Sequence, residues 1–101
     1  MKNLIKRHHV ATWERGLITP ETIIPDFIDK IHEEFLEMTN EYQGEPIPND
    51  EFIHEAVDLV ATTLNMLKFY GIDFMEEFRK NVKYQESRCG ITQPGSQIRL
   101  S

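Results

Sequence analysis

The chain has 101 residues, 40% of them hydrophobic and 28% charged, and a formal net charge of −6. This length fits one domain, and the balance of apolar and charged residues excludes disordered and fibrous proteins. The charge is uneven: residues 26–58 carry eleven acidic side chains and one basic one, so they repel nucleic-acid phosphates, and a phosphate ligand would need a bridging cation.

Cysteine content and the first residues bear on the cellular compartment. The single cysteine, Cys89, excludes an internal disulfide and has no cysteine partner for holding a metal. Basic residues and histidines interrupt the apolar residues of the first 13 positions, which argues against a signal-peptide core, and no stretch is apolar enough to span a bilayer. We therefore expect a cytoplasmic protein with no membrane and no nucleic-acid partner.

Apolar residues recur at helical spacing along most of the chain, which predicts an all-α fold. The first helix is expected over about residues 2–15 and to end near Gly16. Residues 19–22 have the composition of a short capped turn. A second helix is expected over residues 25–42, because its apolar residues fall on one stripe of a helical surface.

The third predicted helix is the most apolar part of the chain. Asn49 or Asp50 is expected to cap its start, and Gly71 follows its expected end. Its apolar residues cover more than half of the helix circumference, so this helix should contact several neighbours.

The fourth helix is expected to open at Asp73, which forms an acidic version of a capping box with Glu76, and to run to about Ser87. Glycine and proline then become frequent, which predicts an extended or disordered tail. The predicted organisation is a single helical domain over residues 1–88, a four-helix bundle, followed by a flexible tail over residues 89–101.

Two pairs of acidic residues indicate chemistry. Glu34 and Glu37 lie three residues apart, as do Glu55 and Asp58, so each pair shares one helix face. The connecting segment is long enough for the two pairs to meet across an antiparallel hairpin. Four converging carboxylates repel one another, and Mg²⁺ would remove that repulsion while keeping positions open for water and phosphates. A solvated acidic face is the alternative, and it is weakest for Asp58, which lies in the least polar helix.

These same residues carry a resemblance to a family. Residues 30–38 resemble the Lys-apolar-x-Glu-Glu-x-x-Glu-apolar helix of MazG-like nucleotide pyrophosphohydrolases, and residues 53–60 are similar to that family's Glu-x-x-Asp helix. The Trp and Arg-Gly-Leu of residues 13–17 and the basic helix of residues 80–88 resemble further parts of the family pattern. The resemblance covers about residues 10–88.

The resemblance implies hydrolysis of a nucleoside triphosphate, or a related nucleotide, to the monophosphate and pyrophosphate, with Mg²⁺ or Mn²⁺ as the cofactor. Glu34, Glu37, Glu55 and Asp58 would bind the metal. A carboxylate that is not fully committed to the metal would accept a proton from the attacking water. We assign this catalytic role to Glu34 or Glu37.

Substrate contacts are predicted in two places. Lys80, Lys83 and Arg88 are expected to hold the outer phosphates, although they can equally form a solvated basic face. Trp13 is expected to stack on the base, although a single tryptophan on an amphipathic helix more often packs in a core or an interface.

Two other readings compete with this one. Glu51-x-x-His54 has the carboxylate and histidine spacing of di-iron bundles, and Asp29-x-x-His32 is a looser copy. A non-catalytic helical interaction module with an acidic face is the second alternative. Because the chain has few helices and a large apolar content, we also expect a homodimer or homotetramer, as the family resemblance implies.

Overall fold

The computed structural model describes residues 2–89, and these residues form helices joined by loops, with no strand among them. The helices, in chain order, are α1 (Lys2–Glu14), α2 (Ile24–Asn40), α3 (Asp50–Phe69) and α4 (Phe74–Cys89). The prediction of an all-α fold is therefore confirmed for this part of the chain. No helix in it is both long and apolar enough to cross a membrane.

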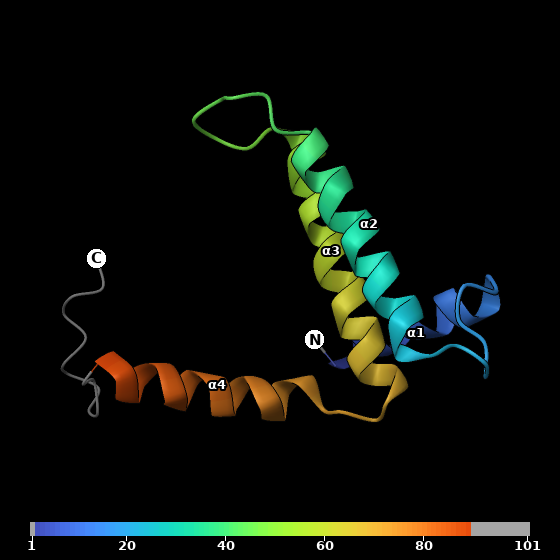
Figure 1. Cartoon of the computed structure of the whole chain (residues 1–101). Helices are drawn as coiled ribbons and strands as arrows, with labels where there is room; N and C mark the ends of the chain where they lie inside the picture. The colour runs from blue at the N-terminus through green and yellow to red at the C-terminus, as the bar shows by residue number, and fades with distance from the viewer. Residues whose placement is uncertain (1, 90–101) are drawn as a thin grey trace.

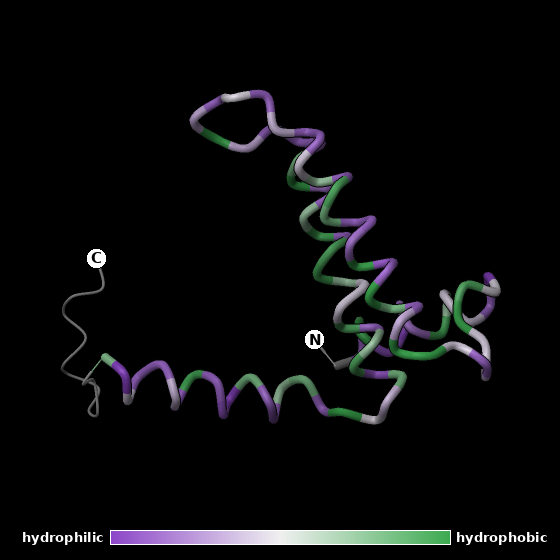
Figure 2. The backbone as a smooth tube through the Cα atoms, in the orientation of Figure 1, coloured by the Kyte–Doolittle hydropathy of each residue, from purple (hydrophilic) through white to green (hydrophobic). Residues whose placement is uncertain are grey.

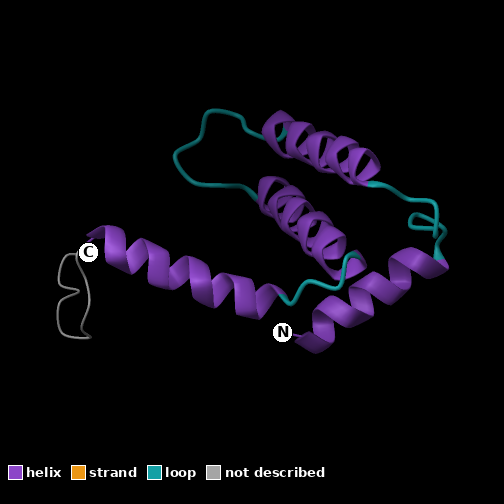
Figure 3. Ribbon diagram, turned by 60° about the horizontal axis from the view of Figure 1, so that its bottom comes forward, coloured by secondary structure: helices purple, strands orange, loops and turns teal. Residues whose placement is uncertain are grey.

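An antiparallel hairpin of α2 and α3 is the centre of the fold (Figure 1). The two helices lie side by side along their lengths, and α1 crosses the end of the hairpin at which α2 begins and α3 ends (Figure 3). Helix α4 extends away from the hairpin, and its main helix contact is with α3. A single chain therefore forms three packed helices and one projecting helix, and the predicted four-helix bundle is not closed within it.

The ends of α3 follow the caps expected from the sequence. The side-chain oxygen of Asn49 accepts a hydrogen bond from the backbone N–H of Phe52 at 2.8 Å, which satisfies a donor in the first helical turn. At the other end Gly71 has a φ of +71°, and the backbone N–H of Ile72 reaches the carbonyl of Leu67 at 2.9 Å. This is a Schellman motif, which favours glycine because of its positive φ.

Several helix boundaries differ by one or two residues from those expected, and α2 ends at Asn40 rather than at residue 42. Helix α2 begins one residue earlier, at Ile24, because the Asp26 carboxylate accepts a hydrogen bond from the Ile23 N–H at 2.9 Å and leaves Pro25 inside the first turn. Helix α4 continues to Cys89 rather than stopping near residue 87, so the first residue of the predicted tail is helical. The rest of that tail, residues 90–101, lies outside the described residues.

A cluster of aromatic rings joins α1, α2 and α3 at one end of the hairpin. The Phe69 ring centroid lies 5.2 Å from that of Phe27 and 5.8 Å from that of Trp13, and it lies 5.0 Å from the Tyr70 centroid. Phe27 is 5% exposed, and Ile18 packs in the same region with 4% exposure. Burial of apolar surface at this end holds the three helices together.

Much apolar surface elsewhere stays exposed. The radius of gyration is 16.8 Å, whereas a compact domain of about 100 residues has a value near 13 Å. Figure 2 shows hydrophobic residues recurring along α3 and along α4, and α4 has no buried residue. The large apolar side chains exposed on these two helices include Ile53, Val57, Val60, Phe78 and Val82.

Replacing Phe27 with alanine should destabilise the fold strongly, because it removes the ring that joins α2 to Phe69 and leaves a cavity. We expect the free energy of unfolding, measured by urea titration with circular dichroism, to fall by about 3 kcal/mol. Tyr42→Ala is the matched control, because its ring is 63% exposed and should contribute less than about 0.5 kcal/mol. Equal losses in the two variants would contradict this description of the core.

Candidate metal centre

Three carboxylates meet where α2 faces α3. Glu34 and Glu37 lie one turn apart on α2, and Glu55 reaches them from α3, with one oxygen of each residue within 4.8 Å of the others. The helical repeat brings the first two together, and the antiparallel pairing of the hairpin adds the third. Like charges at this separation repel, and either a cation or a proton on one of the carboxylates would relieve that repulsion.

Glu34 is the least exposed of the three, at 7%. Its Oε2 lies 3.4 Å from the Nζ of Lys30, which also contacts Glu33 at 2.9 Å. Its Oε1 is buried and has no hydrogen-bond partner among the described residues. A buried acceptor left without a donor costs about 1–3 kcal/mol, and more when it is charged, so a cation at Oε1 would remove a penalty that Lys30 does not.

The pKa of Glu37 is raised, first by the negative charge of Glu34, then by desolvation and by a hydrogen bond that its protonated form can donate to Glu34, and further by the charge of Glu55. The side chain itself is exposed, so solvent moderates the effect. Because the pKa of Glu37 is higher in the folded state than in the unfolded state, protonated Glu37 favours folding at low pH, below the ordinary pKa of glutamic acid. This contribution to the free energy of unfolding is lost as the pH rises through the raised pKa. Without a cation, repulsion within the cluster therefore opposes folding at neutral pH.

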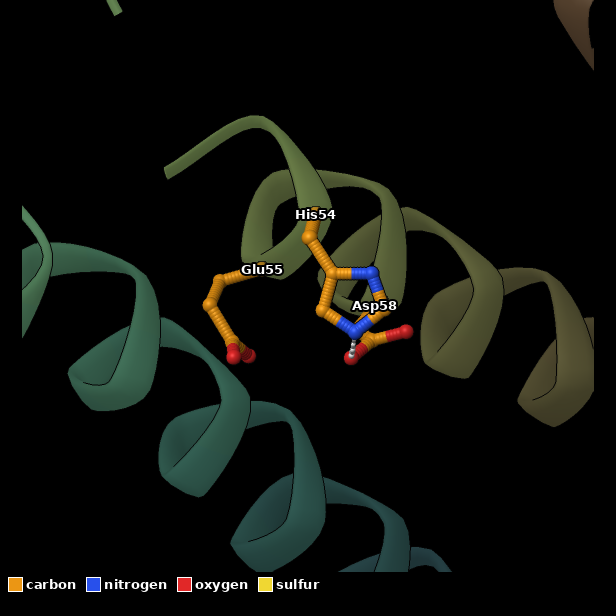
Figure 4. A group of neighbouring side chains, drawn as sticks. All are labelled: His54, Glu55 and Asp58. Atoms are coloured by element: carbon orange, nitrogen blue, oxygen red, sulfur yellow. Dashed lines mark ion pairs between the residues drawn. The ribbon is translucent and has the colours of Figure 1, made fainter. Parts of the chain in front are cut away.

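Asp58 belongs to a second, overlapping group with His54 and Glu55 (Figure 4). The Nε2 of His54 lies 3.5 Å from the Oδ2 of Asp58, and Glu55 is the residue common to both groups. The sequence predicted one set of four carboxylates, whereas the structure brings three together and connects Asp58 to them through Glu55. His54 is a potential ligand that was predicted only for the di-iron alternative; its position four residues before Asp58 was the available signal.

The di-iron reading finds little support in the geometry. Among residues 2–89, neither group of close potential ligands includes Glu51, Asp29 or His32. The two histidine-containing pairs of that pattern therefore do not converge on one centre within this chain. The donor set that does converge is made mainly of carboxylate oxygens, which suits a hard cation such as Mg²⁺ or Mn²⁺ better than a softer metal.

The predicted phosphate-binding residues all lie on α4, away from these carboxylates (Figure 1). Lys80 pairs with Glu77 of its own helix at 3.3 Å, and the guanidinium of Arg88 lies 5.6 Å from the ring centroid of Tyr84. Lys83 is exposed. One chain therefore does not bring these cations to the site, and their role stays a prediction.

Trp13 packs among the aromatic residues at the end of the hairpin. Its ring stacks on Phe69 with an interplanar angle of 21°, and its Nε1–H donates a hydrogen bond to the Nε2 of His9 at 3.0 Å. His9 in turn contacts the buried Asn65 of α3 through its Nδ1. One face and the polar edge of the indole are thus engaged within the protein, and its role in base stacking stays a prediction.

No protein family matches this chain, and no curated protein or solved structure does either. The geometry of the carboxylates and the chemistry of their surroundings therefore carry the functional argument.

Addition of Mg²⁺ or Mn²⁺ at neutral pH should raise the melting temperature, because the cation binds the folded cluster and relieves its repulsion. At a metal concentration about 100 times the Kd the gain is about 2.7 kcal/mol, which corresponds to roughly ten degrees or more for a domain of this size. Glu34→Gln should abolish most of the shift in a differential scanning fluorimetry titration.

Glu33→Gln is the matched control, because Glu33 is the exposed neighbour of Glu34 on α2 and lies outside the cluster. It should keep the full metal response. Lowering the pH toward the pKa of the carboxyl groups should shrink the response of the wild type, since protons then compete for the same oxygens. An equal response of both variants would contradict the assigned ligands.

Proposed function

We propose that this protein is a divalent-metal-dependent pyrophosphohydrolase of the MazG-like type. It would convert a nucleoside triphosphate, or a related nucleotide, to the nucleoside monophosphate and pyrophosphate. The observation that carries the proposal is the buried, unpartnered Oε1 of Glu34 beside Glu37 and Glu55. A structural carboxylate would be expected to have its own hydrogen-bond donors, whereas a metal ligand keeps an oxygen available.

The residues present suit this chemistry. A bound Mg²⁺ or Mn²⁺ would supply charge neutralisation for phosphate oxygens and would make a water molecule more acidic. Glu34, Glu37 and Glu55 would hold the cation, and Asp58 would join them through a small movement of its side chain. Lys30 orients Glu34 from the same helix.

Glu37 is the favoured general base. It is the exposed member of the cluster, so a water molecule can approach its carboxylate. In the proposed reaction the oxygen of water bonds to the α-phosphorus, its proton passes to Glu37, and the bond from that phosphorus to the bridging oxygen of pyrophosphate breaks.

We also propose that the active form is a homodimer or homotetramer. An apolar groove on α3 is open to solvent and is lined by Pro48, Phe52, Ile53, Ala56, Val57 and Val60. Helix α4 offers a matching apolar stripe at Phe74, Phe78 and Val82, with more basic than acidic residues, and the α2–α3 hairpin is strongly acidic. A second copy of the chain satisfies both the apolar and the charge requirement.

Such an assembly would also give α4 a function. If α4 of one copy packs along the hairpin of another, Lys80, Lys83 and Arg88 would lie near the partner's carboxylates, where they could contact phosphates. In such an assembly these three residues could bind the outer phosphates even though they lie far from the carboxylates of their own chain.

Pyrophosphate release tests the activity. Ribo- and deoxyribonucleoside triphosphates with Mg²⁺ or Mn²⁺ should yield pyrophosphate, and release should stop when the metal is chelated. Glu37→Gln should lower kcat by about 100-fold or more, the usual contribution of a general base. Glu41→Gln, one turn further along the chain and outside the cluster, should keep nearly full activity. Silence of the folded wild type across the panel would favour the interaction module instead.

Light scattering tests the assembly. At micromolar concentration the wild type should have a mass of at least two chains, because its apolar faces are covered only by association. Phe78→Glu should shift the protein toward a single chain, since a charge in the stripe of α4 would be buried at the interface. Tyr42→Glu, in the loop after α2, should leave the mass unchanged. A wild type that scatters as one chain would refute the proposal.

A further inference from the structure

A cavity of about 420 Å³ lies next to the carboxylates. It is bounded by α1, the connection from α1 to α2, and the facing sides of α2 and α3. Glu34 and Asp58 form part of its wall, so the buried, unpartnered carboxylate oxygen of Glu34 belongs to a residue that faces this space. Its volume lies within the roughly 300–1,000 Å³ typical of small-molecule sites.

Arg15 is the cation in this wall that has no partner. Its guanidinium makes no hydrogen bond or ion pair within residues 2–89, whereas Lys30, the other strong cation of the wall, contacts both Glu33 and Glu34. Asp26 also lines the cavity, but its carboxylate is engaged at the start of α2 by the Ile23 N–H. Arg15 is therefore free to bind an anion that enters the cavity.

The backbone holds Arg15 in a fixed place. Helix α1 ends in a Schellman motif, in which Gly16 has a φ of +76° and donates its N–H to the carbonyl of Trp13 at 3.0 Å. The N–H of Leu17 reaches the carbonyl of Thr12, also at 3.0 Å. Arg15 is the residue just before the glycine of this motif, so its position is set by the turn and by the burial of Ile18 beyond it.

We propose that this cavity receives the phosphate chain of the substrate and that Arg15 is a phosphate contact supplied by the same chain. The inference rests on the proposed function and deepens it, because it names the binding site next to the metal ligands. A polyphosphate there would contact the cation held by the carboxylates at one end and a planar guanidinium, which suits bidentate contact with phosphate oxygens, at the other. The hydroxyl of Thr62, which makes no hydrogen bond within the described residues, also faces the cavity.

Binding of inorganic tripolyphosphate with excess Mg²⁺, measured by isothermal titration calorimetry, tests the cavity without any contribution from a base or sugar. Arg15→Gln should weaken binding by about tenfold or more, the effect of losing a charge-assisted contact. Arg7→Gln is the matched control, because Arg7 is an exposed arginine of α1, the helix that ends just before Arg15, and does not line this cavity. It removes the same charge and should change the Kd by less than about twofold.

The outcomes separate the two proposals. If the wild type releases pyrophosphate but Arg15→Gln and Arg7→Gln bind tripolyphosphate as tightly as each other, the cavity proposal is wrong and the proposed activity stands. If Arg15→Gln alone loses binding while the wild type releases no pyrophosphate, the phosphate site stands and the proposed activity falls. A folded wild type that does not bind tripolyphosphate overturns the cavity proposal. Circular dichroism of each variant checks that the fold is intact. Both variants should fold, because neither replaced side chain makes a hydrogen bond within the described residues.

Discussion

Burial of the Glu34 carboxylate between two antiparallel helices is the constraint on which the rest of this structure depends. The side chain faces two further glutamates, and one nearby lysine divides its charge between Glu34 and the exposed Glu33. Removing a charge from water is costly, and placing two like charges beside it adds to that cost. A buried carboxylate at this position lowers the stability of the fold unless its charge is compensated, and a bound divalent cation, as proposed above, would compensate it.

The remaining architecture serves that position. The aromatic cluster around Phe27 and Phe69 fixes α1 against one end of the hairpin, and so sets the width of the cavity next to the carboxylates. The network of His9, Thr12 and the buried Asn65 holds α1 to α3 through polar contacts in the same region. The rest of the hairpin and α4 leave apolar faces open, which a second copy of the chain would cover.

Local features of this fold could be predicted from the sequence, because they depend on neighbouring residues. Helical spacing of apolar residues, the Asn49 cap and the glycine after α3 gave the helices and most of their ends. The pairing of Glu34 and Glu37 with Glu55 followed from spacing and from a hairpin. Other features depend on the angles at which helices cross, and the periodicity of apolar residues carries no information about these angles. They are the direction of α4, the separate grouping of Asp58 with His54, and the cavity that includes Arg15.

Diffraction from crystals grown with Mn²⁺ tests the central claim most directly, because anomalous scattering locates the metal without reference to activity. We expect a peak within about 2.0–2.3 Å of carboxylate oxygens of Glu34, Glu37 and Glu55, with Glu34 Oε1 among the ligands. The absence of a peak there, together with a water or a protein donor hydrogen-bonded to Glu34 Oε1, would contradict this claim and would identify the cluster as an acidic surface between two helices.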